Sequence, residues 1–556
     1  MKNIIVLLIS FTIIASANIF NVNDVNSFQN ALTTAQGNGQ DNTINVAAAT
    51  YNVSTPLSYI GSGSSLSIIG VGAGTTILDG GNAVQIMNID QSTSGDILIS
   101  GLTFRNGSNY VNDASNGGGL ALACNDSCSA TLASCVFSNN ITAFGGGGAI
   151  VYVGDGNITI TNCLATKNST YIDDAGGLSA QKESGTGFIF IADNIFYDNH
   201  LGTSSAAVGD VEGSAFYVYS LCPSCDITIS NNLAYGNSLK NGAGTLYARM
   251  TQAANLIICD NIFSNNIATT RGGGIDVELE TGSINIKRNK LIDNTVNGTE
   301  GDGGGIAVTF NTSGTFEFSD NVLVGNTAAR HGGGANLGFG NGVTSAYIIQ
   351  NIFVNNNSGS ADGIGGGLII NSDCNVTLVN NTFFGNVSSS SGGGGFGFYS
   401  ESAGVSAVVF NDIYRTNLPN SVAAIGLRPI AARYSNIEGG SGESYFGAGC
   451  IDTDPLFLNP ALPAGEDGDY ATFDDGLQLT ETSPSIDTGS ASAVPVGITR
   501  DLIGNARIYG EKVDMGCYEF VPEPGAFGAV ISYLLLVVGV YRKNVLKSNV
   551  KCSVYW

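Results

Sequence analysis

One motif recurs along this chain about every thirty residues, and this repetition limits the possible folds more than any other feature. In its clearest copies, which begin at Asn261, Asn351 and Asn381, Phe follows two residues later and a second Asn five residues later. The same first position also holds Asn194, Asn232, Asn289, Asn321 and Asn411. A block of glycines and an apolar run separate successive copies, as in Gly272–Ile275. Repeats of this length are typical of solenoids, in which each repeat packs only on its neighbours.

Each repeat contains three short segments in which apolar and polar residues alternate. One follows the glycines (Ile275, Val277 and Leu279), one precedes the first Asn (Phe316 and Phe318), and one is the Asn-x-Phe stretch itself. Alternation with a period of two predicts β-strands, and the repeats have no helical stripe. The composition, with 77 glycines and only 12% charged residues, excludes a coiled coil. We therefore expect an all-β, right-handed parallel β-helix with three strands per coil and about 4.8 Å between coils.

Stacking the repeats places their asparagines in two columns at the bends of the coil. The first column consists of the eight residues named above, and the second of Asn140, Asn168, Asn199, Asn237, Asn266, Asn294, Asn326, Asn356 and Asn386. An inward amide can donate to the amide of one coil and accept from that of another, which satisfies polar groups that would be costly to bury alone. The glycines before each apolar run suit a bend with positive φ or a close approach of neighbouring coils. We interpret both sets as scaffold.

Cysteines fit the same register. Two of them occupy the first column in the coils before Asn194, and four others lie in pairs at turns. Stacked residues on adjacent coils are separated by a distance that a disulfide can bridge. We expect bridges at two turns and a further one between coils, namely Cys124–Cys128, Cys222–Cys225 and Cys135–Cys163.

The residues ahead of the repeats differ from the rest of the chain. Residues 28–35 have the pattern of a short amphipathic helix, for which Ser27 is the expected N-cap. Such a helix would close the first coil, whose open edge would otherwise pair with other chains. Residues 44–100 are expected to form two or three irregular early coils.

Both ends of the chain carry apolar segments. Residues 1–17 combine a basic start, an apolar run and small residues before a cut after Ala17, the pattern of a secretory signal peptide. Near the other end, an apolar run from Gly525 to Tyr541 is followed by Arg542 and Lys543. Together with the Pro-Glu-Pro of residues 522–524, this order resembles the PEP-CTERM sorting signal of Gram-negative bacteria. The resemblance implies export to the cell envelope, outer membrane or extracellular matrix, with the tail removed in the membrane. A retained transmembrane anchor is the alternative.

Two further resemblances concern the body of the chain. Gly147–Ile150 and Phe-x-x-Asn tetrapeptides such as Phe137–Asn140 are similar to the repeats of polymorphic outer-membrane proteins. Asp454–Phe457, Ser483–Gly489 and Val513–Phe520 resemble choice-of-anchor Q proteins, in which a pectin-lyase-type β-helix precedes a cap and a sorting tail. The expected division of the chain is 1–17 signal peptide, 18–100 N-terminal cap and first coils, 101–440 regular repeats, 441–520 C-terminal cap, 521–543 sorting signal, and 544–556 basic tail.

The charge of the chain limits its partners. Formal net charge is −24, and residues 18–520 alone carry 16 basic against 44 acidic side chains, about −28. Such a body repels phosphate backbones, so nucleic acid is excluded as a partner. We expect a monomer that contacts polysaccharide or extracellular matrix, and that touches a membrane through its C-terminal segment at least transiently.

One set of residues has the types that a polysaccharide lyase needs, a cation or base near the abstracted proton and carboxylates that neutralise a uronate or hold Ca²⁺. The turn before the glycine block carries Arg271, Asp302, Arg330 with His331, and Asp362 on consecutive coils. This row could bind an acidic sugar, with Arg330 or His331 as the base. It could equally be a solvated row of alternating charge that neutralises stacked turns, and we favour this second interpretation.

Two other sets are weaker candidates. Asp276, Glu278 and Glu280 face outward if the residues between them point inward, and they could hold a cation such as Ca²⁺; no other cofactor is evident. Exposed acidic residues on strands more often serve solubility. Tyr217, Tyr219 and Tyr247 on adjacent coils could stack on sugar rings or serve as core aromatics.

These observations favour a secreted, envelope-associated β-helix protein with a structural, adhesive or glycan-binding role. The alternative is a polysaccharide lyase or glycoside hydrolase that acts on acidic polysaccharide. The chain lacks the Asn-Thr-Asp and Gly-His-Gly strings of galacturonases.

Overall fold

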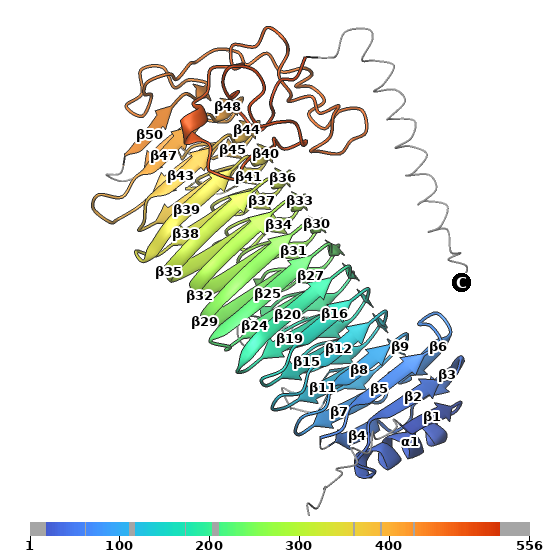
Figure 1. Ribbon diagram of the computed structural model, residues 1–556. Helices are drawn as coiled ribbons and strands as arrows, with labels where there is room; N and C mark the ends of the chain where they lie inside the picture. Colours follow the sequence, from blue (N-terminus) through green and yellow to red (C-terminus); the bar gives the residue numbers. More distant parts are fainter. Residues whose placement is uncertain are drawn as a thin grey trace, which may run out of the picture.

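The computed structural model describes residues 18–522 except 62, 111–116, 173, 203–210, 360–361, 390–391 and 426–428. These residues wind as a right-handed parallel β-helix, which confirms the predicted fold (Figure 1). Three sheets, which we call A, B and C, run along its axis with 25, 14 and 10 strands. The expected signal peptide and sorting tail lie outside the described residues. None of the helices described within residues 18–522 is long and apolar enough to cross a membrane.

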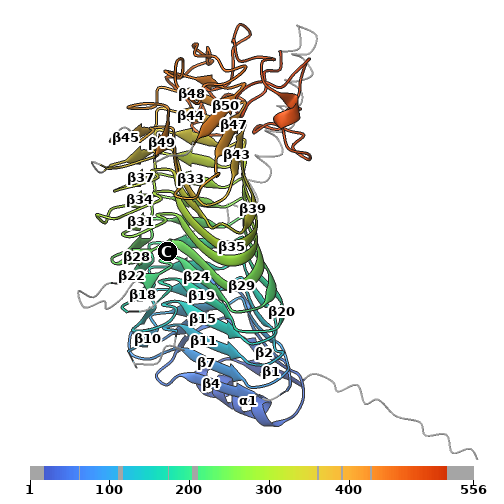
Figure 2. The ribbon, with the colours of Figure 1, turned by 90° about the vertical axis from the view of Figure 1, so that its left-hand side faces the viewer.

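Sheet A receives two strands from most coils, or one long strand that bends across both positions (Figure 2). Its strands are β1 (Asn18–Val22), β2 (Asn42–Val46), β4 (Leu57–Gly61), β5 (Leu66–Gly70), β7 (Met87–Gln91), β8 (Ile97–Ser100), β11 (Leu120–Cys124), β12 (Ala130–Ala133), β15 (Ala149–Val153), β16 (Ile158–Thr161), β19 (Leu178–Lys182), β20 (Thr186–Ala192), β24 (Phe216–Ser220), β25 (Ser224–Ser230), β29 (Leu246–Cys259), β32 (Ile275–Lys287), β35 (Ile306–Ser319), β38 (Ala335–Phe339), β39 (Val343–Ile349), β42 (Leu368–Ser372), β43 (Val376–Val379), β46 (Phe396–Tyr399), β47 (Ala407–Phe410), β49 (Val422–Ile425) and β50 (Ile430–Arg433).

Sheet B contains the Asn-x-Phe segments. Its strands are β3 (Ala49–Asn52), β6 (Thr76–Asp79), β9 (Thr103–Arg105), β13 (Val136–Ser138), β17 (Leu164–Thr166), β21 (Ile195–Tyr197), β26 (Leu233–Tyr235), β30 (Ile262–Ser264), β33 (Lys290–Ile292), β36 (Val322–Val324), β40 (Ile352–Val354), β44 (Thr382–Phe384), β48 (Ile413–Arg415) and β51 (Asn436–Ile437). Where the motif carries an aromatic residue, its ring is buried in the core, and towards the C-terminal end of the sheet these rings stack on one another. Phe353 lies 4.5 Å from Phe383, which lies 4.6 Å from Tyr414.

A fourth segment of each coil, which the sequence pattern did not single out, forms sheet C. Its two-residue strands are β10 (Ser108–Asn109), β14 (Ile141–Thr142), β18 (Ser169–Thr170), β22 (His200–Leu201), β27 (Ser238–Leu239), β31 (Ile267–Ala268), β34 (Thr295–Val296), β37 (Thr327–Ala328), β41 (Asn357–Ser358) and β45 (Val387–Ser388). A separate pair, β23 (Val211–Glu212) with β28 (Gly242–Ala243), continues the turn that leads into sheet A. Two residues are too few to display an alternation, so these strands carry no periodic signal.

The two predicted asparagine columns exist as buried ladders. Asn261 illustrates their geometry: its backbone N–H and its Nδ2 donate to Oδ1 of Asn289 at 3.1 and 3.0 Å, and Nδ2 also donates to the Ile229 carbonyl at 2.9 Å. Every amide therefore uses both its donor and its acceptor groups. The second column is confirmed in full and continues to Asn417.

The last member of the first column differs from the prediction. Asp412, not Asn411, accepts the hydrogen bonds of Asn381. Asn411 lies one residue earlier, with a φ of 57°, and bonds Ser490 instead. Asn is also the non-glycine residue best suited to a left-handed backbone, so an Asn at this bend does not by itself identify the ladder position.

The glycine block serves the close approach that we expected. Gly272 has a φ of 56°, and a Cβ atom at Gly273 would lie 2.2 Å from the carbonyl oxygen of Gly304 on the next coil. Any side chain there would force the coils apart.

The N-terminal helix closes the first coil, but it begins earlier than the pattern predicted. Helix α1 runs from Val25 to Gly37, and its N-cap is Asp24, whose carboxylate accepts from the Ser27 backbone N–H at 2.7 Å. Ser27 is the third helical residue and returns the contact, since its Oγ accepts from the Asp24 backbone N–H at 3.2 Å. The assignment of Ser27 as N-cap was therefore wrong, because the two residues form a reciprocal capping box. The helix buries Phe28 and Leu32 against the coil beneath it.

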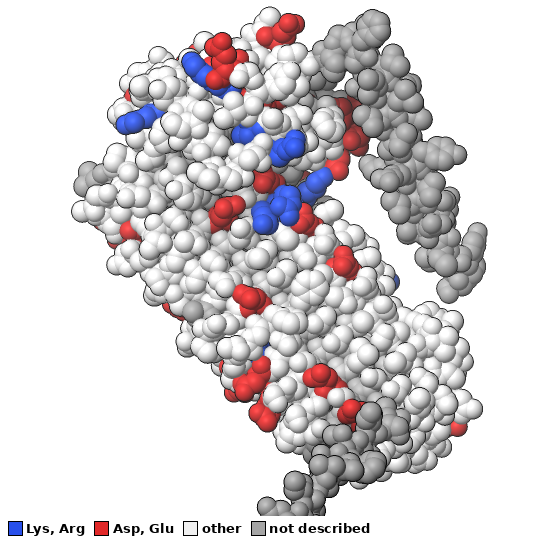
Figure 3. All heavy atoms as spheres, viewed as in Figure 1, with Lys and Arg blue, Asp and Glu red and all other residues white. Residues whose placement is uncertain are grey.

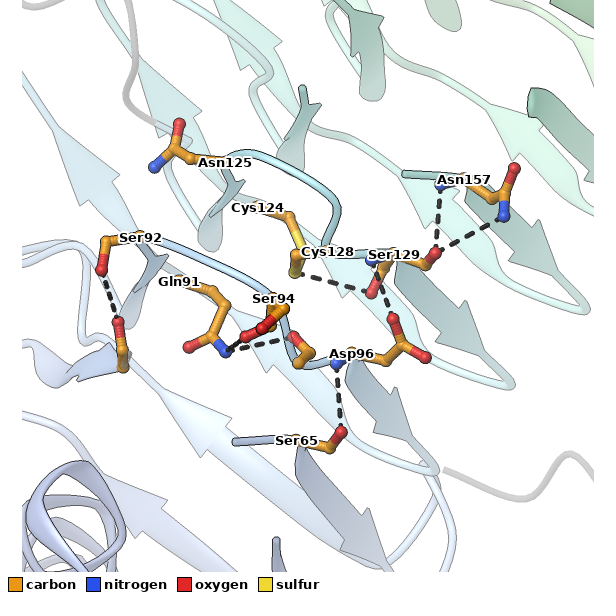
Figure 4. Close-up of a disulfide and its surroundings, with 12 residues drawn as sticks. Ser65, Gln91, Ser92, Ser94, Asp96, Cys124, Asn125, Cys128, Ser129 and Asn157 are labelled. Carbon is orange, nitrogen blue, oxygen red and sulfur yellow. Dashed lines mark hydrogen bonds between the residues drawn. A yellow bond between two sulfur atoms is a disulfide. The ribbon is translucent and has the colours of Figure 1, made fainter. Parts of the chain in front are cut away.

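Two of the three expected disulfides are present, and both lie at turns of sheet A. Cys124 is bonded to Cys128, with Cα atoms 5.3 Å apart (Figure 4), and Cys222 is bonded to Cys225, with Cα atoms 5.8 Å apart. The expected bridge between coils is absent, because Cys135 and Cys163 are both buried free thiols. Their hydrogen bond to each other lowers the pKa of Cys135 and raises that of Cys163.

Other coils fill the same interior turn with buried polar side chains. Nε2 of Gln91 donates to the carbonyls of Ser64, Ser94 and Gly95 (Figure 4). Nζ of Lys182, which is fully buried, donates to the carbonyls of Gly154 and Gly156 at 3.2 and 2.6 Å. The inward carbonyls of this turn thus find donors that differ from coil to coil.

Residues 438–522 leave the solenoid as irregular chain and pack on the outer face of sheet B at its C-terminal end (Figure 1). We call this part the cap. Phe457, Leu479, Met515 and other cap residues form a second core with Val322, Ile352 and Ile413 of sheet B. At its centre, the buried Arg507 pairs with the buried Glu519 at 2.7 Å.

The cap is held by the residues immediately before the first asparagine column, which we call the outer corner column. These residues all have positive φ and are Asp260, Arg288, Asp320, Gln350, Asn380 and Asn411. Nδ2 of Asn380 donates to the carbonyls of Asp514 and Gly516, and Gln350 accepts from Nη1 of Arg507 at 3.1 Å. At this corner of the coil, one residue therefore points inward and forms the ladder, while the residue before it points outward and contacts the cap.

Candidate functional site

Two adjacent columns of polar side chains follow the outer face of sheet A across strands β24, β29, β32 and β35. The strand register fixes them as Tyr217, Tyr247, Asp276 and Ala307 in one column, and Tyr219, Arg249, Glu278 and Thr309 in the other. A third column at the preceding turn contains Glu212, Ala243, Arg271 and Asp302. We call Glu212, Tyr217, Tyr247, Arg249, Arg271, Asp276 and Glu278 the Arg271 cluster.

Arg271 reaches across the cluster from its turn. Its guanidinium donates to Oγ1 of Thr309 at 2.6 Å and lies 3.4 Å from Asp276 and 3.5 Å from Glu278. Arg249 approaches Glu278 from the other side at 3.7 Å. The attraction of Asp276 raises the pKa of Arg271, so this arginine stays charged.

Asp276 is the unusual member of the cluster. Its side chain is only 1% exposed, and neither of its carboxylate oxygens accepts a hydrogen bond of good geometry from a described residue. Burial raises its pKa to about 6 despite the nearby Arg271. A buried carboxyl group without hydrogen bonds is costly, and scaffold positions on a strand do not require one.

Glu212 is a second carboxyl group that holds a proton near neutral pH. Burial raises its pKa to about 7, which hydrogen bonding by Tyr247 counteracts only in part. Burial also raises the pKa of Tyr217 and Tyr247, whose rings stack 5.8 Å apart. Two acids that titrate in this range beside two arginines form the kind of environment found where proton transfer occurs.

The row predicted from the turn residues is present, but it divides into two groups. Arg271 and Asp302 are bridged through their backbones on adjacent coils. Arg330 forms two bonds with the Asp302 carboxylate, at 3.0 and 2.8 Å, and an ion pair with Glu300. The bond to Asp302 raises the pKa of Arg330, so this guanidinium cannot act as a base. Arg271 thus belongs to the cluster, whereas Arg330 neutralises its neighbouring turns.

His331 adjoins this ion pair. Its backbone N–H donates to Asp302 at 3.1 Å, and its Nδ1 is buried without a hydrogen-bond partner among the described residues. Burial lowers the pKa of the imidazole, so it is neutral at pH 7.

The three acidic residues proposed as a cation site do not act together. Asp276 is buried beneath Arg271, Glu278 pairs with two arginines, and Glu280 accepts a hydrogen bond from Asn311. Asp276 therefore does not face solvent as expected, because Arg271 and the neighbouring Tyr247 cover it. Across the part of the chain that the structure describes, no group of three or more His, Cys, Asp or Glu residues is arranged to hold a metal ion.

Sequence reasoning missed part of the cluster. Glu212 and Arg249 carry no motif, and only the strand register brings them to Tyr247 and Asp276. The tyrosines were suspected from sequence, and the structure places Tyr217 and Tyr247 side by side. These two are nearly buried, so their rings do not offer a flat face to a sugar.

Comparisons with known proteins assign no family to this chain. A scan against protein-family models finds no match, and a search of curated proteins finds no relative. Among solved structures, the chain is similar to a PL6 family polysaccharide lyase from Pseudopedobacter saltans, with 11% identity, a TM-score of 0.25, and coverage of 90% of this chain and all of that one. At this identity and TM-score, the similarity says nothing about the site or its chemistry.

Proposed function

We propose that this protein is an exported β-helix protein that binds acidic polysaccharide along the outer face of sheet A, at the Arg271 cluster. The proposal rests mainly on Asp276, a buried carboxyl group that accepts no hydrogen bond from the residues that the structure describes and that lies beneath a charged arginine. A scaffold gains nothing from this arrangement, whereas a binding surface gains donors and acceptors held in fixed positions. The columns span four coils, roughly 15 Å along the axis, which suits an extended chain of sugars.

The charges of the cluster favour a uronate-containing chain. Arg249 and Arg271 supply guanidinium groups that can form two parallel hydrogen bonds with a carboxylate. Glu212 and Asp276 compete for these cations only when ionised. Because their pKa values are about 7 and about 6, both are largely protonated near pH 5. Affinity for an acidic glycan should therefore rise as the pH falls from 8 to 5.

Binding to hexagalacturonate, measured by calorimetry at pH 6, tests the proposal. Arg271→Gln should weaken binding at least tenfold. Asp276→Asn keeps the shape of the side chain and should remove the part of the pH dependence that Asp276 contributes, leaving the part due to Glu212. Arg105→Gln is the matched control, since Arg105 pairs with Asp79 on sheet B at 2.7 Å, away from the cluster. If the wild type binds no acidic glycan, or Arg271→Gln binds as the wild type does, the proposal is wrong.

A second candidate function is cleavage of the same polysaccharide, and the two raised carboxyl pKa values favour it. In a β-elimination, a base removes the proton at C5 of a uronate, the bond to the leaving oxygen at C4 breaks, and a C4–C5 double bond forms. Arg271 would pair with the uronate carboxylate, and the Glu212 carboxylate, whose pKa is raised to about 7, would accept the C5 proton and return it to the departing O4 oxygen. The product absorbs in the ultraviolet, so activity would appear as rising absorbance that Glu212→Gln abolishes. Binding without such a product supports the non-catalytic function.

The proposal includes the cellular address that the sequence predicts. The choice-of-anchor Q and PEP-CTERM resemblances suggest a protein delivered to the cell envelope, outer membrane or matrix, where polysaccharide is at hand. Mass spectrometry of the protein from its native host tests this: export with sorting predicts a mature chain that begins at Asn18 and lacks residues after the Pro-Glu-Pro. An intact C-terminus in a membrane fraction would favour a retained anchor.

A further inference from the structure

A cleft of about 410 Å³ separates the cap from the outer face of sheet B, and none of the sequence motifs points to it. We call it the cap groove. Its solenoid wall carries Arg288, Lys290, Asp320 and Gln350, and its cap wall carries Arg500 and Asp501. The volume falls within the range of small-molecule sites in proteins. On the face shown in Figure 3, Lys and Arg side chains gather next to the cap, while the rest of that face carries few cations.

The three cations of the cap groove retain hydrogen-bond donors. Arg288 uses Nε and Nη2 on Asp260, both at 2.8 Å, which leaves Nη1 without a partner among the described residues. Nζ of Lys290 contacts Asp469 and the Tyr470 carbonyl, which accounts for two of its three protons. Nη1 of Arg500 donates to the Gly504 carbonyl at 3.0 Å, and within the described chain no carboxylate lies within ion-pair distance of this guanidinium.

The acids of the cap groove compete weakly for these donors. Asp501 accepts from the backbone N–H groups of Ile503, Asn505 and Glu519 and from Nδ2 of Asn505, so its oxygens are already satisfied. Asp320 accepts from Nε2 of Gln350 at 2.7 Å, and burial raises its pKa to about 6. The groove therefore has more free N–H donors on its cations than free acceptor oxygens on its carboxylates.

The cap groove is also fixed in shape. The buried Gln350 amide donates to Asp320 on one coil and to the Arg500 carbonyl of the cap, and it accepts from the buried Arg507. One side chain thus joins the solenoid wall, the cap wall and the central ion pair of the cap. A site held in this way loses little freedom when a ligand binds.

From this geometry we propose that the cap groove is a second ligand site, which binds a carboxylate-bearing oligosaccharide through Arg500, Arg288 and Lys290. The carboxylate meets the cations, and the remaining groove length accepts the adjoining sugar. This proposal does not rest on the Arg271 cluster, because the two sites lie on different sheets and share no residue.

Calorimetric titration of the full chain with trigalacturonate tests the proposal, carried out in the Arg271→Gln background so that binding at the cluster does not contribute. Arg500→Gln should weaken the remaining binding at least tenfold, and Arg288→Gln about threefold, because the ion pair with Asp260 already engages two of the three guanidinium nitrogens of Arg288. Arg433→Gln is the matched control, since Arg433 also has no acidic partner within the described residues, but it lies at the end of β50 away from the groove. The control should bind within twofold of its parent.

Two further ligands show whether the groove recognises the carboxylate, the sugar or both. Maltotriose has the same size without a carboxylate and should not bind, and sodium sulfate should displace trigalacturonate only in large excess. The proposal is overturned if Arg500→Gln binds trigalacturonate as its parent does or if maltotriose binds equally well. It is also overturned if sulfate matches the affinity of the sugar, because the groove would then recognise an ion alone. Failure of the Arg271 cluster to bind would leave each of these results unchanged.

Discussion

Consecutive residues at one corner of the coil have opposite properties. The first asparagine column points inward and repeats a single residue type for seven coils, from Asn194 to Asn381. The outer corner column, one residue earlier in each repeat, changes type at nearly every coil and includes Arg288, Asp320 and Gln350. Both columns occupy the same bend, and only the direction of the side chain differs.

This difference separates what builds the solenoid from what can give it a function. An inward amide must match the amides above and below it, so no other residue type meets the same four hydrogen-bonding demands. An outward residue at positive φ must only tolerate its backbone, so its side chain is free to dock a cap or line a groove. The same contrast holds on strand β32, where Ile275 and Val277 fill the core and Asp276 carries the candidate site.

The largest effect on stability is expected from a substitution in the first asparagine column. Asn289→Ala removes the acceptor of Asn261 and one donor to Asn321, and it leaves the Ile258 carbonyl without its partner. Three buried polar groups at about 1–3 kcal/mol each predict a loss of about 3–9 kcal/mol in the free energy of unfolding. Urea denaturation of the purified protein measures it. Asn255→Ala, on the exposed surface of the preceding coil, is the control and should cost less than about 0.5 kcal/mol. Equal losses in both variants would contradict the role of the ladder.

The next effect concerns the cap that the outer column docks. Arg507→Met leaves the buried Glu519 without its cation, a change that typically costs about 3–5 kcal/mol. The loss should be local, so we expect limited proteolysis to cleave within residues 441–522 while the solenoid stays intact. Arg500→Met, on the exposed rim of the groove, should leave the digestion pattern unchanged. A uniformly sensitive solenoid would indicate that the cap and the coils unfold together.

The first asparagine column could be predicted from the sequence, whereas the role of the outer corner column could not, and the difference has a physical cause. A ladder needs the same residue in each coil, so the ladder produces a repeat that can be recognised in the sequence, as at Asn266 and Asn294. The functional candidates follow no period: Glu212, Arg249 and Arg500 meet their partners only through strand register or through the fold of the cap. The one error in the ladder, Asn411 in place of Asp412, arose where two adjacent positions both suit asparagine. The cap groove could not have been predicted, because residues as distant in sequence as Arg288 and Arg500 line it together, and no local pattern encodes that arrangement.

At the end of the first asparagine column, Asp412 takes the place of an asparagine, and this provides a third test. Asp412 is fully buried, and burial raises its pKa to about 8, so the native state keeps a proton that the unfolded chain releases. The contribution of Asp412 to stability should therefore be greatest below about pH 4 and fall as the pH rises to about 8. Asp412→Asn supplies an amide that cannot ionise, so it should stabilise the protein by about 1–3 kcal/mol at pH 8 and by much less at pH 5. Thermal denaturation at both pH values measures the difference. An equal effect at pH 5 and pH 8 would show that Asp412 does not titrate in this range.

The smallest effect on stability is expected from a substitution in the outer corner column. Arg288 gives the most direct comparison, because it immediately precedes Asn289. Arg288→Gln removes the ion pair with Asp260, but both side chains are more than a third exposed and solvent screens their attraction. Exposed pairs of this kind contribute about 0–1 kcal/mol, so urea denaturation should detect a change below about 1 kcal/mol. The ratio of the losses at 289 and 288 therefore measures how strictly the fold depends on the inward side of this corner. A loss at Arg288 as large as that at Asn289 would mean that the outer corner column is part of the scaffold, and that its variation along the chain has no bearing on function.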